Sequence, residues 1–306
     1  MTPYNSILLL RAEEGISGSM PAQKRHKTLR TRLRSLLPSR FRGGPRIPVV
    51  RLEGAIGRTG PLARGMTLDS VAGVLEKAFA DDAAPVVVLA INSPGGSAAQ
   101  SHLIHARIRA LAEENGKTVL AFVEDVAASG GYMIACAADE IHVDPASIVG
   151  SIGVVSGGFG FTEAIGRLGI ERRLYTAGDS KAMLDPFLPE KPDQVARLKQ
   201  IQAAIHARFI ALVRARRGNR LNEVEEDLFT GAFWAGDRAL ELGLVDGIGD
   251  LHGVLRARFG AGLKLVEIRA RKGFNLRRWL GADSAGLADA LATTLDERAL
   301  WSRYGL

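Results

Sequence analysis

Residues 118–155 read TVLAFVEDVAASGGYMIACAADEIHVDPASIVGSIGVV, and the rest of the chain is organised around this stretch. It begins with the apolar, β-rich run Thr118–Val123, which predicts a buried strand. Small residues, Ser129 and two glycines follow, and the run Tyr132–Ala138 is typical of a helix. A serine at a strand-to-helix turn lies where backbone N–H groups converge and a nucleophile can be exposed. We therefore predict that Ser129 is a catalytic nucleophile.

Strand and helix signals alternate on both sides of this stretch, which is typical of βαβ units in a layered α/β domain. The apolar spacing of three and four over residues 195–212 predicts one long amphipathic helix. The predicted strands cover residues 47–56, 85–92, 118–123, 139–145, 170–177 and 263–268. The predicted helices cover residues 67–80, 97–114, 132–138, 161–168, 195–212, 235–243 and 250–258, with two further helical patches around Trp279 and over 287–300.

The composition is that of an ordinary globular protein, with 46% hydrophobic and 24% charged residues in 306. The single Cys136 excludes an intrachain disulfide and a cysteine-rich metal site, and we expect neither a metal nor a cofactor. No apolar run approaches the roughly 18 residues of a membrane span, and Ile7–Leu10 is too short for a signal-peptide core. The expected location is therefore the cytoplasm or the inner face of the membrane.

Positive charge is concentrated near the N-terminus. Residues 24–46 contain nine Lys or Arg and no acid, so the remainder carries +7 − 9 = −2. Leu29, Leu33, Leu36 and Leu37 follow helical spacing within this basic segment, as in a helix on an anionic membrane surface. A solvated basic tail fits as well, and nucleic-acid binding is the least favoured alternative. Met20 is a second candidate start, in which case residues 1–19 would not be translated.

A second glycine-rich turn follows the predicted strand at 85–92. In SPGGS (93–97), Pro94 fixes the turn, while Gly95 and Gly96 allow the backbone to approach a ligand closely. Such a loop at the carboxyl end of a strand can supply an oxyanion-binding N–H. Taken alone, the motif is equally consistent with a simple tight turn.

Five motifs that follow one another along the chain indicate a family more specifically than either glycine-rich turn does. They are INSPGGS (91–97), AASGGYMIACAAD (127–139), GSIGVV (150–155), GDSKAMLDPF (178–187) and ALELGLVDGIG (239–249). Together they resemble the signal peptide peptidase A (SppA/SohB-like) family of Ser–Lys dyad serine peptidases, over about residues 47–258. The resemblance implies a crotonase/Clp-protease-like layered fold of ββα units. It also implies a homo-oligomer whose neighbouring subunits complete each active site, and substrates such as cleaved signal peptides or other unstructured segments.

The resemblance assigns roles to individual positions. Ser129 matches the family's nucleophile, and Lys181, 52 residues later, matches its general base. The backbone N–H groups of Gly96 and Gly130 match the oxyanion hole, and Ser151 matches a hydroxyl that orients the lysine. The chain departs from the family pattern over residues 229–236, FTGAFWAG, and we expect it to lack the membrane anchor that many members carry.

The chemistry of the residues is consistent with a lysine base. A serine hydroxyl needs a neighbouring base, and no histidine occurs between residues 143 and 205. A lysine can take this role only if burial without a carboxylate partner lowers its pKa by roughly three units from about 10.4. Asp179 and Asp185 flank Lys181, so both must point away from it.

These observations predict a basic N-terminal arm (1–46), a peptidase domain (47–268) and a helical C-terminal tail (269–306). The expected activity is peptide-bond hydrolysis through an acyl-enzyme. Two alternatives remain open: acyl-CoA chemistry on the same crotonase-type fold, and a non-catalytic scaffold associated with membranes through the basic arm.

Overall fold

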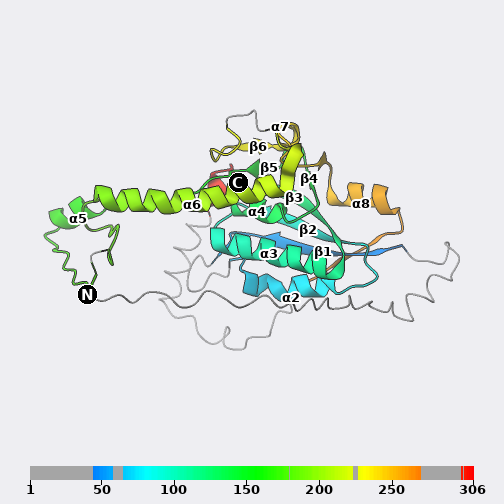
Figure 1. The fold of residues 1–306 in the computed structure, drawn as a ribbon, viewed down its shortest axis with the longest axis horizontal. Coiled ribbons are helices and arrows are strands. Elements are labelled where there is room, and N and C mark those ends of the chain that lie inside the picture. Colours follow the sequence, from blue (N-terminus) through cyan, green and yellow to red (C-terminus); the bar gives the residue numbers. More distant parts are fainter. Residues whose placement is uncertain (1–43, 58–64, 179, 223–226, 270–297, 299) are drawn as a thin grey trace, which may run out of the picture. The chain divides into compact units, whose positions relative to one another are not determined.

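The computed structural model describes residues 44–57, 65–178, 180–222, 227–269, 298 and 300–306. Within Gly43–Leu306, which forms one compact unit, helices pack on both faces of a largely parallel sheet (Figure 1). The strands are β1 (Arg46–Glu53), β2 (Val86–Ser93), β3 (Thr118–Ala128), β4 (Glu140–Val143), β5 (Ile148–Gly150), β6 (Phe233–Ala235), β7 (Gly247–Ile248) and β8 (Lys264–Glu267). The helices are α2 (Leu68–Phe79), α3 (Ala98–Asn115), α4 (Gly130–Ala135), α5 (Thr162–Arg167), α6 (Pro192–Arg217), α7 (Gly236–Glu241) and α8 (Leu251–Phe259), with a 3-10 turn at Gly218–Arg220.

The sheet runs in the order β6-β5-β3-β2-β1-β8, and β4 pairs with both β3 and β7. All pairings are parallel except that of β5 with β6. The central strand β2, VVVLAINS, is buried along nearly its whole length because helices cover both faces. The layered α/β fold expected from the sequence is confirmed.

On the side opposite β2, strand β3 has two different partners along its length. Leu120–Val123 pairs with β4, whereas Val126–Ala128 pairs with β5. The second half of β3 therefore leaves its first neighbour and ends beside β5. This divergence places the residues after Ala128 and after Gly150 next to each other, at the carboxyl ends of β3 and β5. We refer to this end of the two strands as the sheet edge.

Local signals account for the helices on one face of the sheet. Thr67 begins α2 with a reciprocal capping box to Ser70, and Ser97 caps α3. Gly116 ends α3 in the left-handed conformation that glycine adopts without strain. The buried side chains of α2, α3 and α4 form the main core with the sheet, and α8 covers a smaller cluster on the other face.

The carboxyl end of α6 is tied to the sheet by arginines. Arg217, which is 2% exposed, donates to both carboxylate oxygens of Asp246 at 2.7 and 3.0 Å. Arg216 donates to the carbonyls of Cys136 at 2.7 Å and Ala138 at 2.9 Å, at the end of α4. These bonds fix α6 against α4, so the helix face around Phe209 has a defined position over the sheet edge.

One predicted element is wrong. The β-rich run Ile170–Ala177 forms no strand, and every residue of it is exposed. A strand needs a partner for its backbone groups, and none of the described strands lies beside this run. The other predicted strands and helices up to residue 268 are confirmed, while the patches around Trp279 and at the start of 287–300 lie outside the described residues.

Candidate active site

Ser129 occupies a strained turn between β3 and α4. Its φ of 51° and ψ of −118° are unusual for a residue with a side chain, and such strain is frequent at functional sites. The residues on either side are buried, whereas Ser129 is partly exposed. The turn is held from both directions, because the Ser129 carbonyl accepts from the Met133 N–H at 3.0 Å and its own N–H donates to Gly150 at 2.8 Å.

The SPGGS loop packs directly on this turn. A Cβ atom at Gly95 would lie 2.8 Å from the Ala128 carbonyl oxygen and 2.9 Å from the Ser129 Cβ, so only glycine permits the contact. The loop is fixed to Ile56, whose N–H donates to Gly95 and whose carbonyl accepts from Ser97, both at 2.8 Å. Neither bond uses the N–H of Gly96.

Ser151 lies next to Ser129 because of the strand register. Ala128 and Gly150 are paired positions of β3 and β5, and each serine is the next residue along its strand. Ser151 also has a positive φ, 53°, and its N–H donates to the Ala232 carbonyl at 2.7 Å. Two strained serines thus leave the same sheet edge side by side.

A cleft of about 630 Å³ opens at this edge. It brings together Ser129, Ser151, Gly96 and Gly130, four of the five residues that the sequence singled out. The remaining lining comes from segments far apart in the sequence. These residues are Pro94, Ala98, Met133, Gly153, Val154, Val155, Ser156, Ile205, Phe209, Thr230, Gly231, Leu300, Arg303 and Tyr304.

Lys181 is the predicted residue that the cleft does not contain. It is exposed and lies in the loop between α5 and α6. In Figure 1, α5 and the adjoining start of α6 lie away from α4, whose first turn follows Ser129. Of its flanking acids, Asp185 accepts from Arg172 at 2.9 Å, and bonds from the Phe187 N–H and Arg172 lower the pKa of Asp185. Asp179 is outside the described residues.

The cleft formed by one chain contains no candidate base for Ser129 among its described residues. Arg303 is the one charged side chain of that lining, which contains neither a histidine nor a carboxylate side chain. His206 lies nearby on α6, but its Nε2 contacts the Ile152 carbonyl at 2.9 Å and it does not line the cleft. The nucleophile, the oxyanion glycines and the second serine are therefore assembled, and the base is not.

Sequence reasoning missed several cleft residues. Ile205 and Phe209 belong to the apolar stripe of α6, which the spacing identified only as a buried helix face. Their proximity to Ser129 depends on how α6 crosses the sheet. For Leu300, Arg303 and Tyr304 the sequence contains no signal, because they lie about 170 residues after the serine.

Cys136 packs in the hydrophobic core. It is fully buried just after the end of α4, and burial raises the pKa of its thiol to about 11. The thiol is therefore protonated at neutral pH and is not a nucleophile.

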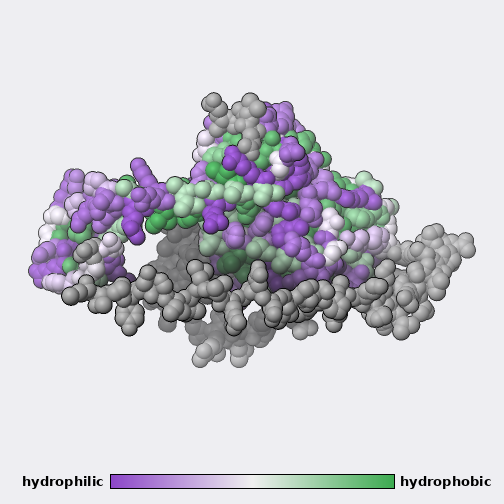
Figure 2. Space-filling view, in the orientation of Figure 1, coloured by the Kyte–Doolittle hydropathy of each residue, from purple (hydrophilic) through white to green (hydrophobic). Residues whose placement is uncertain are grey.

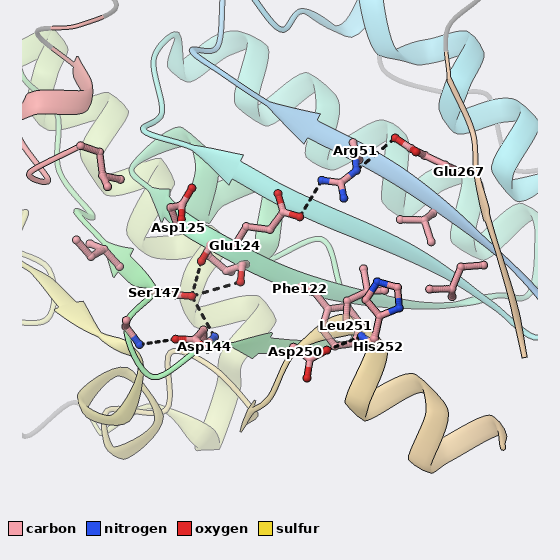
Figure 3. A pocket seen from close by; sticks show the side chains of 16 residues that line it. Arg51, Phe122, Glu124, Asp125, Asp144, Ser147, Asp250, Leu251, His252 and Glu267 are labelled. Carbon is pink, nitrogen blue, oxygen red and sulfur yellow. Dashed lines mark hydrogen bonds and ion pairs between the residues drawn. The ribbon is translucent and has the colours of Figure 1, made fainter. Parts of the chain in front are cut away.

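A second cavity, of about 710 Å³, lies beside the middle of β3 and the start of α8 (Figure 3). Five carboxylates line it, and its arginine, Arg51, is already paired with Glu124 at 2.8 Å and Glu267 at 3.3 Å. Its serine, Ser147, donates to the Glu124 carbonyl and accepts from the Asp144 N–H at 3.0 Å. The Ser147 hydroxyl is thus bonded to backbone groups, whereas Ser129 bonds through its own backbone groups. This cavity therefore offers no nucleophile comparable to the Ser129 hydroxyl.

Comparison with known proteins assigns the family. Residues 112–259, which include Ser129, Ser151 and Lys181, match the family model described as Peptidase family S49. The chain belongs to this family. The S49 match also supports the crotonase/Clp-protease type of layered fold that the motifs implied.

Several relatives share long stretches with this S49 chain. It is 34% identical to Protease 4 of Haemophilus influenzae over 68% of the chain and 33% of that protein. It is 29% identical to the putative signal peptide peptidase SppA of Enterococcus faecium over 72% of the chain and 65% of that protein. It is 52% identical to a Brucella abortus protein named Na(+)/H(+) antiporter NhaA, over 90% of the chain.

The chain spans 39% of the Brucella protein and 33% of Protease 4, so most of each relative lies outside the match. The antiporter name therefore describes a longer protein. Within the described ranges of the S49 chain, no helix is long and apolar enough to cross a membrane. The same ranges contain no group of three or more His, Cys, Asp or Glu placed to hold a metal ion.

Proposed function

We propose that this S49 chain is a serine endopeptidase that hydrolyses peptide bonds through an acyl-enzyme on Ser129. The observation that carries the proposal is the assembly of Ser129, Gly96, Gly130 and Ser151 in one cleft. The names of the relatives, Protease 4 and signal peptide peptidase, agree with it. The absence of a carboxylate from the described lining disfavours acyl-CoA chemistry, which needs such groups as acid and base.

The proposed reaction uses the groups at the sheet edge. The Ser129 Oγ attacks the peptide carbonyl carbon, while a neutral lysine Nζ takes the hydroxyl proton. The N–H groups of Gly96 and Gly130 hold the negative oxygen of the tetrahedral intermediate, each contributing about 10²- to 10³-fold in rate. Collapse breaks the C–N bond, and the lysine returns the proton to the leaving amine. Water then attacks the ester with the same lysine as base, which releases the acid and restores Ser129.

We propose that the base is Lys181 of the partner subunit. Within one chain Lys181 is exposed and outside the cleft. The segment that carries it exposes many large apolar side chains, including Phe159 at 81% and Tyr175 at 90%. Figure 2 shows hydrophobic surface along α6 and, among polar residues, at its α5 end. The exposed apolar residues of this segment are Val155, Phe159, Phe161, Leu168, Ile170, Leu174, Tyr175, Leu188 and Ile201.

Subunit contact on this segment would serve two purposes. Burying the apolar side chains would favour association by about 25 cal/mol per Å² of apolar surface. The same contact would also remove Lys181 from solvent, as a lysine acting as a general base requires. The unpaired run Ile170–Ala177, β-rich in sequence, would find strand partners in the neighbouring copy. We accordingly propose a homo-oligomer in which Ser151 orients the incoming lysine.

The proposed substrates are extended apolar peptides such as signal-peptide remnants or other unstructured segments. Much of the cleft lining is apolar, with Val154, Val155, Ile205, Phe209 and Leu300 as examples. An unfolded segment can enter such a cleft with its backbone and side chains exposed, whereas a folded domain cannot.

We further propose that the basic segment 24–46, of which residues 24–43 lie outside the described residues, binds an anionic membrane surface. Sedimentation with vesicles containing anionic lipid, compared with neutral vesicles and with a chain lacking residues 24–42, tests this. Equal sedimentation of both chains would contradict it. Binding of this kind would place the peptidase at the cytoplasmic face of a membrane.

The decisive experiment measures cleavage of internally quenched peptides by the full-length oligomer. Ser129→Ala and Lys181→Ala should each reduce kcat by at least about 10³-fold and leave the fold intact. Lys77→Ala, on the exposed face of α2, is the matched control and should retain activity. Substantial activity in Ser129→Ala would refute the nucleophile, and substantial activity in Lys181→Ala would refute the dyad.

A further inference from the structure

The C-terminal residues of the chain form part of the cleft wall. Tyr304 is buried at 9% exposure against Val126 and Ala128 of β3, the strand that ends at Ser129. Its ring meets Phe233 of β6 edge-on, with centroids 5.1 Å apart. Trp301 packs on the same cluster beside Ile148. The last turn of the chain is therefore anchored to both strands that carry the candidate active site.

This anchoring gives Arg303 a defined place at the cleft. Leu300, Arg303 and Tyr304 all line the cavity that contains Ser129, as residues three and four apart on one helical turn do. Tyr304 and Leu300 contribute apolar surface. Arg303 is exposed, so its guanidinium is free to meet a ligand at the mouth of the cleft.

Two electrostatic facts single out Arg303. It is the one charged side chain among the described residues of the lining, and no described residue forms an ion pair or hydrogen bond with its guanidinium. Other arginines of the fold are mostly paired, such as Arg217 with Asp246 and Arg258 with Glu140. A guanidinium with no ion-pair partner among the described residues, at the edge of a cleft whose described lining is otherwise uncharged, can attract a carboxylate and bind it in a bidentate manner.

We propose that Arg303 is a specificity-determining residue that selects peptides carrying a carboxylate within the span of the cleft. This inference rests on the proposed peptidase function and names the substrate class of that site: an apolar extended peptide with one carboxylate. The carboxylate has two possible sources, an Asp or Glu side chain and the free C-terminus of a short peptide. Arg303 contacts the substrate in this proposal and takes no part in proton transfer.

The test uses full-length oligomer and matched pairs of quenched peptides. One arm compares Asp with Asn at each position around the cleavage site, and the other compares a free C-terminal acid with its amide. Wild-type protein should show a kcat/KM about three- to tenfold higher for the charged member of one arm, and the arm that responds identifies the source. The preference should weaken between roughly 0.05 and 0.5 M salt.

Variants connect that preference to the residue. Arg303→Gln should bring the ratio close to one, and Arg303→Glu should invert it. Arg298→Gln, also exposed near the C-terminus but outside the cleft lining, is the matched control and should keep the wild-type ratio. A wild-type ratio of one in both arms, or a preference unchanged in Arg303→Gln, overturns the proposal.

A binding measurement keeps this inference separate from the proposed catalysis. Fluorescence anisotropy with Ser129→Ala protein compares the acid and amide, or Asp and Asn, forms of a labelled peptide. Tighter binding of the charged form that is lost in the Ser129→Ala, Arg303→Gln double variant supports the role of Arg303 even if no hydrolysis is found. Ser129-dependent hydrolysis with equal binding and cleavage of both forms leaves the peptidase proposal intact and refutes the role of Arg303.

Discussion

The N–H of Ser129 donates to the carbonyl of Gly150 at 2.8 Å, so the turn after β3 is bonded to the residue that precedes Ser151. Both serines have positive φ, 51° and 53°, where a side chain is disfavoured. A single hydrogen bond thus joins two strained turns. The candidate nucleophile and the serine beside it cannot move independently, and the register of β3 with β5 fixes their separation.

The SPGG loop should be equally intolerant of change. A Cβ at Gly96, whose φ is 140°, would lie 2.2 Å from the Ile56 carbonyl oxygen, so Gly96→Ala must shift the loop. Displacing one oxyanion donor should lower kcat by about 10²- to 10³-fold, with a smaller change in KM. Gly73→Ala on α2, where a Cβ meets nothing within 4 Å, is the control. Steady-state kinetics normalised by active-site titration provide the measurement, and a near wild-type kcat in Gly96→Ala would rule Gly96 out as an oxyanion donor.

A base supplied by the partner subunit predicts complementation. Ser129→Ala and Lys181→Ala oligomers should each be inactive, but subunits exchanged between them should form some sites with an intact Ser129 and an intact Lys181. We expect activity to return to between a tenth and a half of wild type after dissociation and reassembly of a mixture, because a fraction of interfaces is productive. If verified mixed oligomers stay inactive while each parent assembles normally, the base is not contributed in trans.

The buried ion pair of α6 should dominate the stability of this helix. Arg217→Ala leaves the Asp246 carboxylate half-buried without its main partner, so unfolding free energy should fall by about 3–5 kcal/mol. Arg217→Met, which preserves volume, should lose less. Arg238→Ala, which breaks an exposed pair with Glu241, should cost at most about 1 kcal/mol. Urea unfolding followed by circular dichroism compares the three, and equal losses in Arg217→Ala and Arg238→Ala would contradict the importance of this pair.

His105 should make the fold sensitive to mild acid. Burial, together with the nearby Arg216, His102 and Arg109, lowers its pKa from 6.5 to about 4, and its Nε2 has no hydrogen-bond partner among the described residues. Between these two pH values the unfolded chain binds about one more proton at this position than the folded chain. Stability from this group is therefore fully present above pH 6.5 and decreases as the pH falls toward 4, by about 3 kcal/mol in total.

The corresponding experiment measures urea unfolding at several pH values from 7.5 to 4. In His105→Gln, the slope of unfolding free energy against pH should be smaller by the equivalent of about one bound proton. His252→Gln, at an exposed position of α8, should keep the wild-type slope. An unchanged slope in His105→Gln would show that other groups cause the acid sensitivity.

The sequence by itself determined the local parts of this protein. The apolar run before Ser129, the glycines after it and the SPGG turn are short-range signals, because strand burial and backbone conformation depend on neighbouring residues. The same reasoning predicted the helices over 67–80, 97–114 and 195–212, and the apolar face of the last of these. It also predicted the grouping of Ser129, Gly96, Gly130 and Ser151, through the order of the motifs that identify the family.

The tertiary structure alone decided what surrounds that group. The split pairing of β3 places Ser151 beside Ser129, and the arginine contacts of α6 bring Phe209 to the cleft. Arg303 lines the same cleft because Tyr304 packs against β3, and no local sequence pattern predicts this contact. The failed strand at 170–177 and the exposed Lys181 have one physical reason in common. Backbone pairing and burial depend on whichever surface is adjacent, and the described part of a single chain places no such surface at these residues.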